Sequence, residues 1–476
     1  MKKNDLFDLT CTSLGANLEG VCHADGIAVF VPGMLPDETA PVRIVKVQSD
    51  YAFGILDGPI VSPSPTRVMS DCPAYPKCGG CDGRHMSYEA TLEAKRQKVQ
   101  GCFQRIAHMD LSVPPVLGMD DPFHYRNKTS FPVGGAKDDP ILGFFAPRSH
   151  RIISTSSCLN AMEPTDGICS VFLDWMKEHR LTPYQEQTHT GLIRHLVIRV
   201  NSDHESMVTL VARKANVPFL RDLARRLEPF HVTSLILNVN SASTNVILGP
   251  EYLTVAGSGI LHDRILGLDF ALSPASFFQV NVSQAERLYT LAISYAGLSG
   301  TQEVFDVYCG TGTISLLLAR HAGHVTGIEV VPQAIENAIL NAQTNRISNV
   351  SFHTGTAEEL LPLLIRQHTR PDVIVVDPPR KGLEPSVVQT IWEAAPDRLV
   401  YVSCNPATLA RDVALFAQHG YHVINLQCVD MFCYASDVET VCLLSKIRSA
   451  PHIDIDLNMT ELEVTKAETK ATYEKI

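Results

Sequence analysis

The sequence predicts a multidomain protein with three folded parts: a small N-terminal β-barrel, a β-rich central domain and a C-terminal α/β domain with a doubly wound parallel sheet. Short strand-like runs separated by turn residues fill the chain up to about residue 62. From about residue 276, apolar strand-like runs alternate with helical stretches, which is typical of parallel sheets. The length of 476 residues also exceeds what one hydrophobic core usually holds.

Composition narrows the class of protein. The sequence contains neither a signal peptide nor an apolar run of the roughly 18 residues that a membrane span needs, so we expect a cytoplasmic protein with no membrane partner. Thirteen cysteines, an odd count, favour reduced thiols, metal ligation or catalysis. The formal net charge is −11, so any RNA site must be a local basic patch.

The pattern over residues 1–62 predicts a small barrel of OB type. Turn residues at 20–26 precede a strand-like run at 27–31. An alternating run at 42–47 is followed by another strand-like run at 51–55. Barrels of this type often bind oligonucleotides, but the pattern alone leaves the role of this one open.

Residues 63–86 begin with a Pro-Ser-Pro linker and carry three cysteines within ten positions: Cys72, Cys78 and Cys81. Cys158 is the candidate for a fourth ligand. Four thiolates suit either zinc or an iron–sulfur cluster. The spacing differs from that of a paired zinc ribbon, yet spacing alone leaves the choice of metal open.

The segment 87–110 is expected to be a helix that packs on the catalytic domain. Its cations Lys95, Arg96 and Lys98 are interpreted as a solvated helix face. Residues 111–275 are expected to form the central β-rich, RNA-binding domain, which supplies Cys158, with one helix at about 217–227.

Residues 276–450 are expected to form the Rossmann-like α/β domain, and residues 451–476 an acidic extension. Two apolar runs near the end, joined by a short connection, predict a terminal antiparallel pair. The expected parallel strands cover residues 303–308, 325–329, 350–353, 372–376 and 398–402.

Three of these strand ends carry residues that suit one ligand. Gly310 and Gly312 follow the first strand, where glycine lets the backbone approach a ligand closely. Glu329 ends the next strand, and a carboxylate there can accept both hydroxyls of a ribose. With Asp377 before a Pro-Pro-Arg corner, the pattern favours S-adenosylmethionine over a dinucleotide, whose usual glycine spacing is absent. The alternative is a tight turn in an unrelated doubly wound domain.

Cys404 follows a further strand, at the edge where open α/β sheets bind ligands. Carbon 5 of a pyrimidine has no lone pair, but a thiolate added to carbon 6 makes it nucleophilic towards a methyl group. A base must then remove the carbon-5 proton so that the thiolate can leave. We predict that Cys404 is this nucleophile, activated by the N-terminus of the following helix. The alternative is a cysteine that only packs.

With these residues in place, the chain resembles the RNA (uracil-5-)-methyltransferases, class I enzymes, of the RlmD/RumA-like type that acts on 23S ribosomal RNA. The resemblance covers roughly residues 5–476, and the barrel is similar to a TRAM domain. It implies Cys404 as the nucleophile and Glu439 as the general base. Besides the turn at Gly310, it implies that the methyl donor contacts Gln279, Tyr308, Glu329 and Asp377.

One segment departs from the family pattern. The family usually has a proline, a threonine and a histidine before the base, whereas this chain has Cys433, Ala435 and Asp437 at those positions. The departure leaves the geometry of this loop open. The alternative for Glu439 is an exposed acid at the start of a strand.

The resemblance also implies a structural 4Fe–4S cluster on Cys72, Cys78, Cys81 and Cys158. The transfer-RNA branch of the family typically lacks these cysteines, so 23S ribosomal RNA is the expected partner, bound by a monomer. Arg126 and Lys128, next to aromatic residues, are predicted to contact RNA.

The predicted function is therefore S-adenosylmethionine-dependent methylation of carbon 5 of a uridine in 23S ribosomal RNA, through a covalent cysteine–uracil intermediate. Two alternatives stay open: a tRNA uracil-5-methyltransferase, and a non-catalytic RNA-binding factor for ribosome assembly on a methyltransferase fold.

Overall fold

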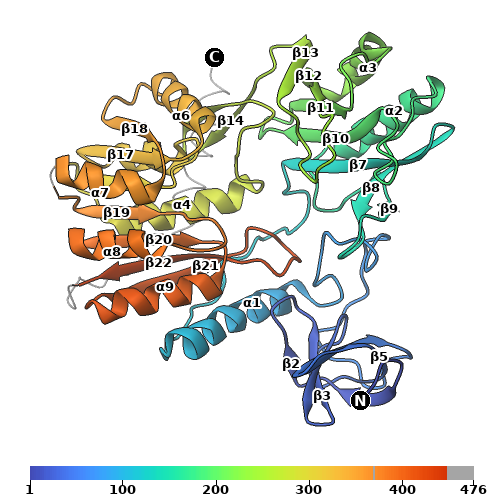
Figure 1. Ribbon diagram of the computed structural model, residues 1–476, viewed down its shortest axis with the longest axis horizontal. Helices are drawn as coiled ribbons and strands as arrows, with labels where there is room; N and C mark the ends of the chain where they lie inside the picture. The colour runs from blue at the N-terminus through green and yellow to red at the C-terminus, as the bar shows by residue number, and fades with distance from the viewer. Residues whose placement is uncertain (368–369, 447–476) are drawn as a thin grey trace, which may run out of the picture.

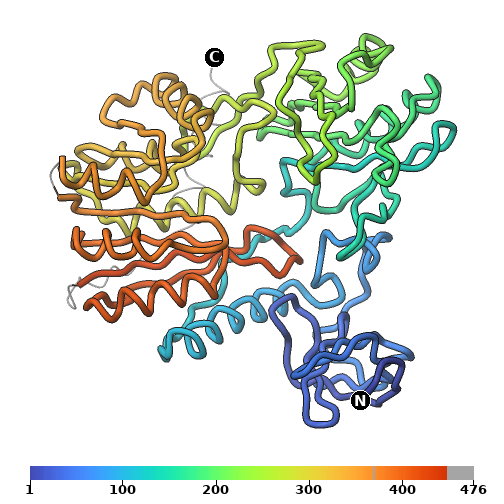
Figure 2. Tube along the Cα trace, viewed as in Figure 1, coloured from blue at the N-terminus to red at the C-terminus, as the bar shows by residue number. Residues whose placement is uncertain are grey.

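The computed structural model describes residues 1–367 and 370–446. Figure 1 shows a larger α/β part beside a central β-rich part, with the long helix α1 (Tyr88–Cys102) between the α/β part and the N-terminal β-barrel. The trace shows the central and α/β parts side by side, with the barrel below them (Figure 2). The acidic extension expected at residues 451–476 lies outside the described residues. Within the described ranges, no helix has the length and apolarity to cross a bilayer.

The N-terminal part is a six-stranded sheet in the order β1-β5-β6-β4-β3-β2, wrapped around an apolar core. Every second side chain of β5 from Ala40 to Ile44 is buried, as expected for a strand with one face on the core. Gly54 faces this core, and an added Cβ there would lie 2.4 Å from Val42 Cγ1. The strands are β1 (Leu6–Thr10), β2 (Ser13–Leu14), β3 (Gly20–Ala24), β4 (Ile27–Val31), β5 (Thr39–Val47) and β6 (Tyr51–Leu56).

The central part is a seven-stranded sheet in the order β13-β12-β11-β10-β7-β8-β9, with two helices on one face. The prediction of a single helix here was wrong. The helix α2 buries Ile168, Phe172 and Trp175, which recur at helical spacing, against the sheet. The elements are β7 (Lys128–Ala136), β8 (Asp139–Phe145), β9 (Ile152–Ser154), α2 (Thr165–Glu178), β10 (Ile193–Val200), β11 (Ser206–Ala212), α3 (Leu220–Leu227), the short helix η2 (Glu228–Phe230), β12 (Val232–Val239) and β13 (Glu251–Gly257).

The C-terminal part contains a seven-stranded sheet in the order β18-β17-β16-β19-β20-β22-β21. The first five strands are parallel and β22 is antiparallel to both of its neighbours. The predicted fold class is confirmed, including the terminal antiparallel pair. The strands are β16 (Glu303–Val307), β17 (His324–Glu329), β18 (Val350–Thr354), β19 (Val373–Val376), β20 (Arg398–Ser403), β21 (His422–Val429) and β22 (Glu439–Ser445).

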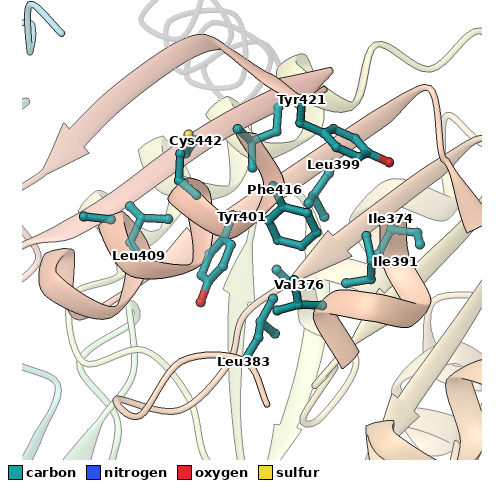
Figure 3. Packing of buried hydrophobic residues seen from close by; sticks show 14 of the residues in the cluster. Ile374, Val376, Leu383, Ile391, Leu399, Tyr401, Leu409, Phe416, Tyr421 and Cys442 are labelled. Atoms are coloured by element: carbon teal, nitrogen blue, oxygen red, sulfur yellow. The ribbon is translucent and has the colours of Figure 1, made fainter. Parts of the chain in front are cut away.

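Helices cover both faces of this sheet through two apolar clusters. One cluster joins the sheet to α7, α8 and α9, and Figure 3 shows Phe416 of α9 among side chains of β19, β20 and α8. The other joins the sheet to α4, α5 and α6. Their bounds are α4 (Val282–Ala296), α5 (Thr313–Ala319), α6 (Pro332–Thr344), α7 (Ala357–Gln367), α8 (Pro385–Ala394) and α9 (Pro406–Gln418).

A hairpin of β14 (Leu261–Ile265) and β15 (Leu268–Leu272) lies before the expected start of the α/β part at residue 276. Its buried residues Ile265, Phe270 and Leu272 belong to the same cluster as α4. The expected division at residue 275 therefore separates this hairpin from the core on which it packs.

The helix α1 (Tyr88–Cys102) continues into a single π-helical turn, η1 (Phe103–Ala107), and both contact α9. The interpretation of Lys95 as solvated was wrong. Its side chain is fully buried and its ammonium pairs with the equally buried Asp430, because only a matched charge makes such burial tolerable. Lys95 Nζ also donates to the carbonyl of Phe432, at 2.9 Å.

Candidate active site

The carboxyl ends of β16, β17, β19 and β20 meet at one cavity of about 920 Å³. Such edges are where open α/β sheets bind ligands. The structure brings together every residue predicted to bind the donor or to react, while their individual roles stay predictions. The cavity is lined by Gln279, Tyr308, Gly310, Glu329, Asp377, Cys404 and Glu439, among others.

The turn after β16 holds the backbone close to the cavity. Gly312 has a φ of 81°, and an added Cβ would lie 2.9 Å from Ala338, so glycine is required there by conformation and by space. Glu329, at the end of β17, accepts from the N–H of Gly310 at 3.2 Å and from the N–H of Val331 at 2.9 Å. These two bonds orient its carboxylate at the mouth of the turn.

Asp306, to which sequence reasoning assigned no role, does not line the cavity, but its charge acts on Asp377, which does. Asp306 is fully buried at the end of β16, where Ser315 Oγ donates to its Oδ2 at 2.5 Å and its Oδ1 has no partner. Burial raises the pKa of this carboxyl to about 7. Its place directly before the glycine turn was the available signal.

Two buried acids, Asp377 and Glu439, line the cavity itself. Burial and the neighbouring Asp306 raise the pKa of Asp377 to about 7. Burial, Asp377 and Asp437 raise the pKa of Glu439 to about 8. A carboxyl with a pKa near neutrality can both take and return a proton at working pH, which suits a general base. Glu439 is only 6% exposed, so the alternative of an exposed acid was wrong.

Cys404 lies between β20 and α9, at the cavity wall. Burial, followed by the nearby Glu439 and Asp377, raises the pKa of its thiol to about 11, and only Arg380 among its charged neighbours acts to lower it. The expected activation by the N-terminus of α9 is therefore outweighed. The alternative of a cysteine that only packs is weakened, because the side chain lines the cavity.

Residues 430–438, which we call the base loop, connect β21 to Glu439 at the start of β22. Asp437, which replaces the family's histidine, pairs with Arg380 at 2.9 Å. Sequence reasoning gave Arg380 no role, although it follows the Pro-Pro corner. The pair joins the base loop to the loop that carries Asp377.

The four predicted metal ligands lie near one another, because the charges of Cys72, Cys81 and Cys158 all act on the thiol of Cys78. Gly80 N–H donates to Cys78 Sγ at 3.3 Å, and Asn160 Nδ2 donates to Cys81 Sγ at 3.4 Å. Amide donors of this kind are typical around thiolate-bound clusters. However, no group of three or more His, Cys, Asp or Glu residues in the described part of the chain has the arrangement of a metal site. The four thiols therefore have the chemistry that a cluster needs, but the described residues do not have the arrangement of a metal site.

The two predicted RNA contacts lie at the start of β7, half-buried, close to the buried Arg199. Arg126 Nε donates to the carbonyl of Lys128 at 3.1 Å. Burial, Arg199 and Arg126 lower the pKa of Lys128 to about 8. The adjacent Asn127 Nδ2 donates to the carbonyl of Gln279 at 2.9 Å, which connects these cations to the wall of the donor cavity.

Comparison with known proteins gives concordant matches. Residues 87–447 match the family described as tRNA (Uracil-5-)-methyltransferase, and residues 6–56 match the TRAM domain. A protein of Clostridium tetani named as an RNA methyltransferase is 42% identical over 448 residues, which cover 94% of this chain and 97% of that protein. One of Halalkalibacterium halodurans, similarly named, is 41% identical and covers 93% of this chain and 98% of that protein.

The crystal structure of Pyrococcus abyssi tRNA (uracil-54, C5)-methyltransferase in complex with S-adenosyl-L-homocysteine is also similar. Its TM-score is 0.74 at 25% identity, and the match covers 92% of this chain and all of that chain. Together with the cavity, these matches define an RNA methyltransferase that uses S-adenosylmethionine. Within that class, the chain belongs to the tRNA (uracil-5-)-methyltransferase family, and it carries a TRAM domain. The predictions of family, methyl donor and enzyme class are confirmed.

Proposed function

We propose that this enzyme methylates carbon 5 of a uridine in 23S ribosomal RNA through a covalent bond between Cys404 and the base. The observation that carries the proposal is one cavity lined by Cys404, by the buried acid Glu439 and by the residues of the donor site. A direct transfer to nitrogen or oxygen needs no thiol at this position, whereas transfer to carbon 5 needs both a thiol and a base.

We assign each residue on the donor side of the cavity a contact with S-adenosylmethionine. The carboxylate of Glu329 is oriented by two backbone N–H groups and accepts the ribose hydroxyls. We assign Gln279, Tyr308 and Asp377, which line the same cavity as Cys404, to contacts with the donor. S-adenosylmethionine supplies the methyl group and a sulfonium charge, which lowers the pKa of nearby acids and thiols.

The chemical steps follow from the positions of two side chains. The thiol of Cys404 passes its proton to water, and the resulting thiolate sulfur forms a bond to carbon 6 of the uracil. The electron pair of the former C5–C6 double bond then forms a bond to the methyl group at carbon 5, while the sulfonium–methyl bond breaks and S-adenosylhomocysteine is left. Glu439 removes the carbon-5 proton, the double bond re-forms, the C6–S bond breaks and Cys404 leaves as a thiolate.

Four cysteines support ribosomal RNA as the substrate. We propose that Cys72, Cys78, Cys81 and Cys158 hold a 4Fe–4S cluster that stabilises the segment between the barrel and α1. Zinc stays the competing occupant. Protein purified without oxygen should be brown with broad visible absorption, and a colourless, zinc-loaded sample would contradict the cluster.

Cations next to the cavity support an RNA contact. Arg126, Lys128 and Arg199 lie close together, and the mutual repulsion of like charges is relieved when a phosphate lies between them. Because this group adjoins Gln279, we propose that it holds the strand from which the target uridine is flipped into the cavity.

The test is an incubation of the enzyme with labelled S-adenosylmethionine and with ribosomal and transfer RNA from a strain that lacks the gene. The expected product is 5-methyluridine in 23S ribosomal RNA, absent with Cys404→Ala. Transfer RNA is the second candidate substrate, because the Pyrococcus abyssi neighbour is named for uracil 54 of tRNA. Label only in transfer RNA supports that candidate, and no incorporation into either RNA supports a non-catalytic assembly factor.

A further inference from the structure

The segment that carries the three clustered cysteines also contacts the base loop, more than 300 positions away in the sequence. The backbone N–H groups of Asp82 and Gly83 both donate to the carbonyl of Tyr434, at 2.9 Å each. The guanidinium of Arg84 lies over the ring of Tyr434, 4.4 Å from its centroid. The middle of the base loop is therefore held by the residues directly after Cys81.

A second group of contacts lies closer to the base. Ser436 N–H donates to Asp82 Oδ2 at 2.8 Å, and Lys98 Nζ of α1 donates to the carbonyl of Ser436 at 2.8 Å. Ser436 is buried and precedes Glu439 by only three residues. Asp82 thus holds the backbone N–H of Ser436, and Lys98 holds its carbonyl.

The base loop has Cys433, Ala435 and Asp437 where the family usually has a proline, a threonine and a histidine. One turn bond lies within the loop, from the N–H of Ala435 to the carbonyl of Phe432 at 3.1 Å, and contacts from outside the loop add to it. Buried backbone groups need partners, and Asp82 and Lys98 supply them at Ser436.

We propose that Asp82 and Lys98 are positioning residues for Glu439, acting through Ser436. The inference rests on the proposed function, because it concerns the step in which Glu439 removes the carbon-5 proton. If the base is displaced, the thiolate still adds and the methyl group is still transferred. The proton then stays on carbon 5, the C6–S bond cannot break, and the methylated RNA stays attached to Cys404.

The experiment measures this attachment directly. Full-length enzyme reacts with substrate RNA containing ordinary uridine and with S-adenosylmethionine, and protein–RNA complexes that survive denaturation are quantified beside released product. Asp82→Ala should accumulate the complex and slow product release on the order of 10- to 100-fold, because small misplacements of a catalytic group have effects of that size. Asp82→Asn should release product nearly as the wild type does, because its amide oxygen still accepts from Ser436.

The matched control is Asp71→Ala. Asp71 lies in the same segment and pairs with Arg84 at 3.1 Å, so its removal reaches Tyr434 through that guanidinium and leaves both bonds to Ser436 intact. This variant should not accumulate the complex. If Asp82→Ala does not fold, Lys98→Met tests the same proposal at the carbonyl of Ser436, and it should also accumulate the complex.

The failure of this proposal and the failure of the proposed function give different results. If Glu439→Gln accumulates the complex but neither Asp82→Ala nor Lys98→Met does, the positioning role is overturned and the covalent mechanism stands. If Glu439→Gln and wild type on 5-fluorouridine RNA both yield no complex, the covalent mechanism itself is overturned. A slower Asp82→Ala enzyme without the complex, or a defect that Asp82→Asn does not rescue, also contradicts the proposal.

Discussion

The donor side and the base side of the cavity are held in different ways. On the donor side, the carboxylate of Glu329 is held by the N–H groups of Gly310 and Val331, which lie in the segments directly after the paired parallel strands β16 and β17. On the base side, Glu439 follows a loop held by Asp82 and by Lys95 of α1, more than 300 residues earlier. The comparison teaches that the position of the proposed donor ligand depends on a local motif, whereas the position of the proposed base depends on the assembly of distant segments.

The largest effect is expected from removal of the proposed nucleophile, Cys404, on which both sides of the cavity act. Cys404→Ala should reduce methylation by roughly 10³-fold or more, because the variant has no thiol to activate carbon 5. Binding of S-adenosylmethionine, measured by calorimetry, should change little, since the residues assigned to the donor are intact. A variant that still forms 5-methyluridine at a comparable rate would rule out the covalent mechanism.

The second prediction tests how α1 holds the base side, by comparing the free energies of unfolding of two variants of this helix. Lys95→Met leaves the buried carboxylate of Asp430 without its cation, so the free energy of unfolding should fall by about 3–5 kcal/mol. Chemical denaturation checks the value. Arg96→Met, on the same helix, removes a solvent-accessible pair with Glu93 and a 3.3 Å hydrogen bond to the carbonyl of Val113, and it should cost about 1 kcal/mol. Equal losses in the two variants would show that α1 does not hold the base loop as described.

The same contrast explains what the sequence could and could not predict. The β-strands around the turn at Gly310 were predictable because each is a short apolar run bounded by turn residues, a pattern that is set locally in the sequence. Glu329 and Cys404 fall at the ends of such strands. The burial of Lys95 was not predictable, because helical spacing of lysine looks the same on a solvated face. Its partner, Asp430, comes from a strand end that only the folded chain brings near.

The sequence also did not reveal the state of the buried acids near the cavity. Asp306 was visible in the sequence, but its unpartnered oxygen and raised pKa arise from burial, which residue type alone does not reveal. The missed helix α2 has another cause. Apolar residues such as Ile168 and Trp175 recur at helical spacing, but the short strand-like runs around them dominated the pattern.

The third prediction tests the local character of the donor side. Glu329→Gln retains one acceptor oxygen for the N–H of Gly310 but loses the charge and one acceptor for the ribose. The KM for S-adenosylmethionine should rise about tenfold, corresponding to about 1–2 kcal/mol, with a smaller change in kcat. Steady-state kinetics at saturating RNA measure both. A kcat loss as large as that of a base-side variant would break the proposed division between the two sides.

The smallest expected effect concerns the pH dependence of stability on the base side. Glu439 has a pKa of about 8 in the folded protein, raised from an ordinary value of 4.5, so the folded state holds this proton more tightly than the unfolded state. Its contribution to stability is therefore present at low pH and is lost as the pH rises from about 4.5 through about 8. Glu439→Gln keeps no titrating proton at this position. Between pH 5 and pH 8.5 the Tm of Glu439→Gln should fall less than the Tm of the wild type. The difference between the two falls should be a few degrees, at about 2–4 °C per kcal/mol.

The control for this measurement is Glu336→Gln, which changes an exposed glutamate on α6 and should follow the wild-type profile. Asp306 and Asp377 also have raised pKa values, so the wild-type decline has more than one source and Glu439→Gln should remove only part of it. If the Tm of Glu439→Gln declines with pH as steeply as that of the wild type, Glu439 is already ionised in the folded protein. The base would then need no release of a bound proton before it acts, and the decline of the Tm with pH would have to come from the other buried acids, Asp306 and Asp377.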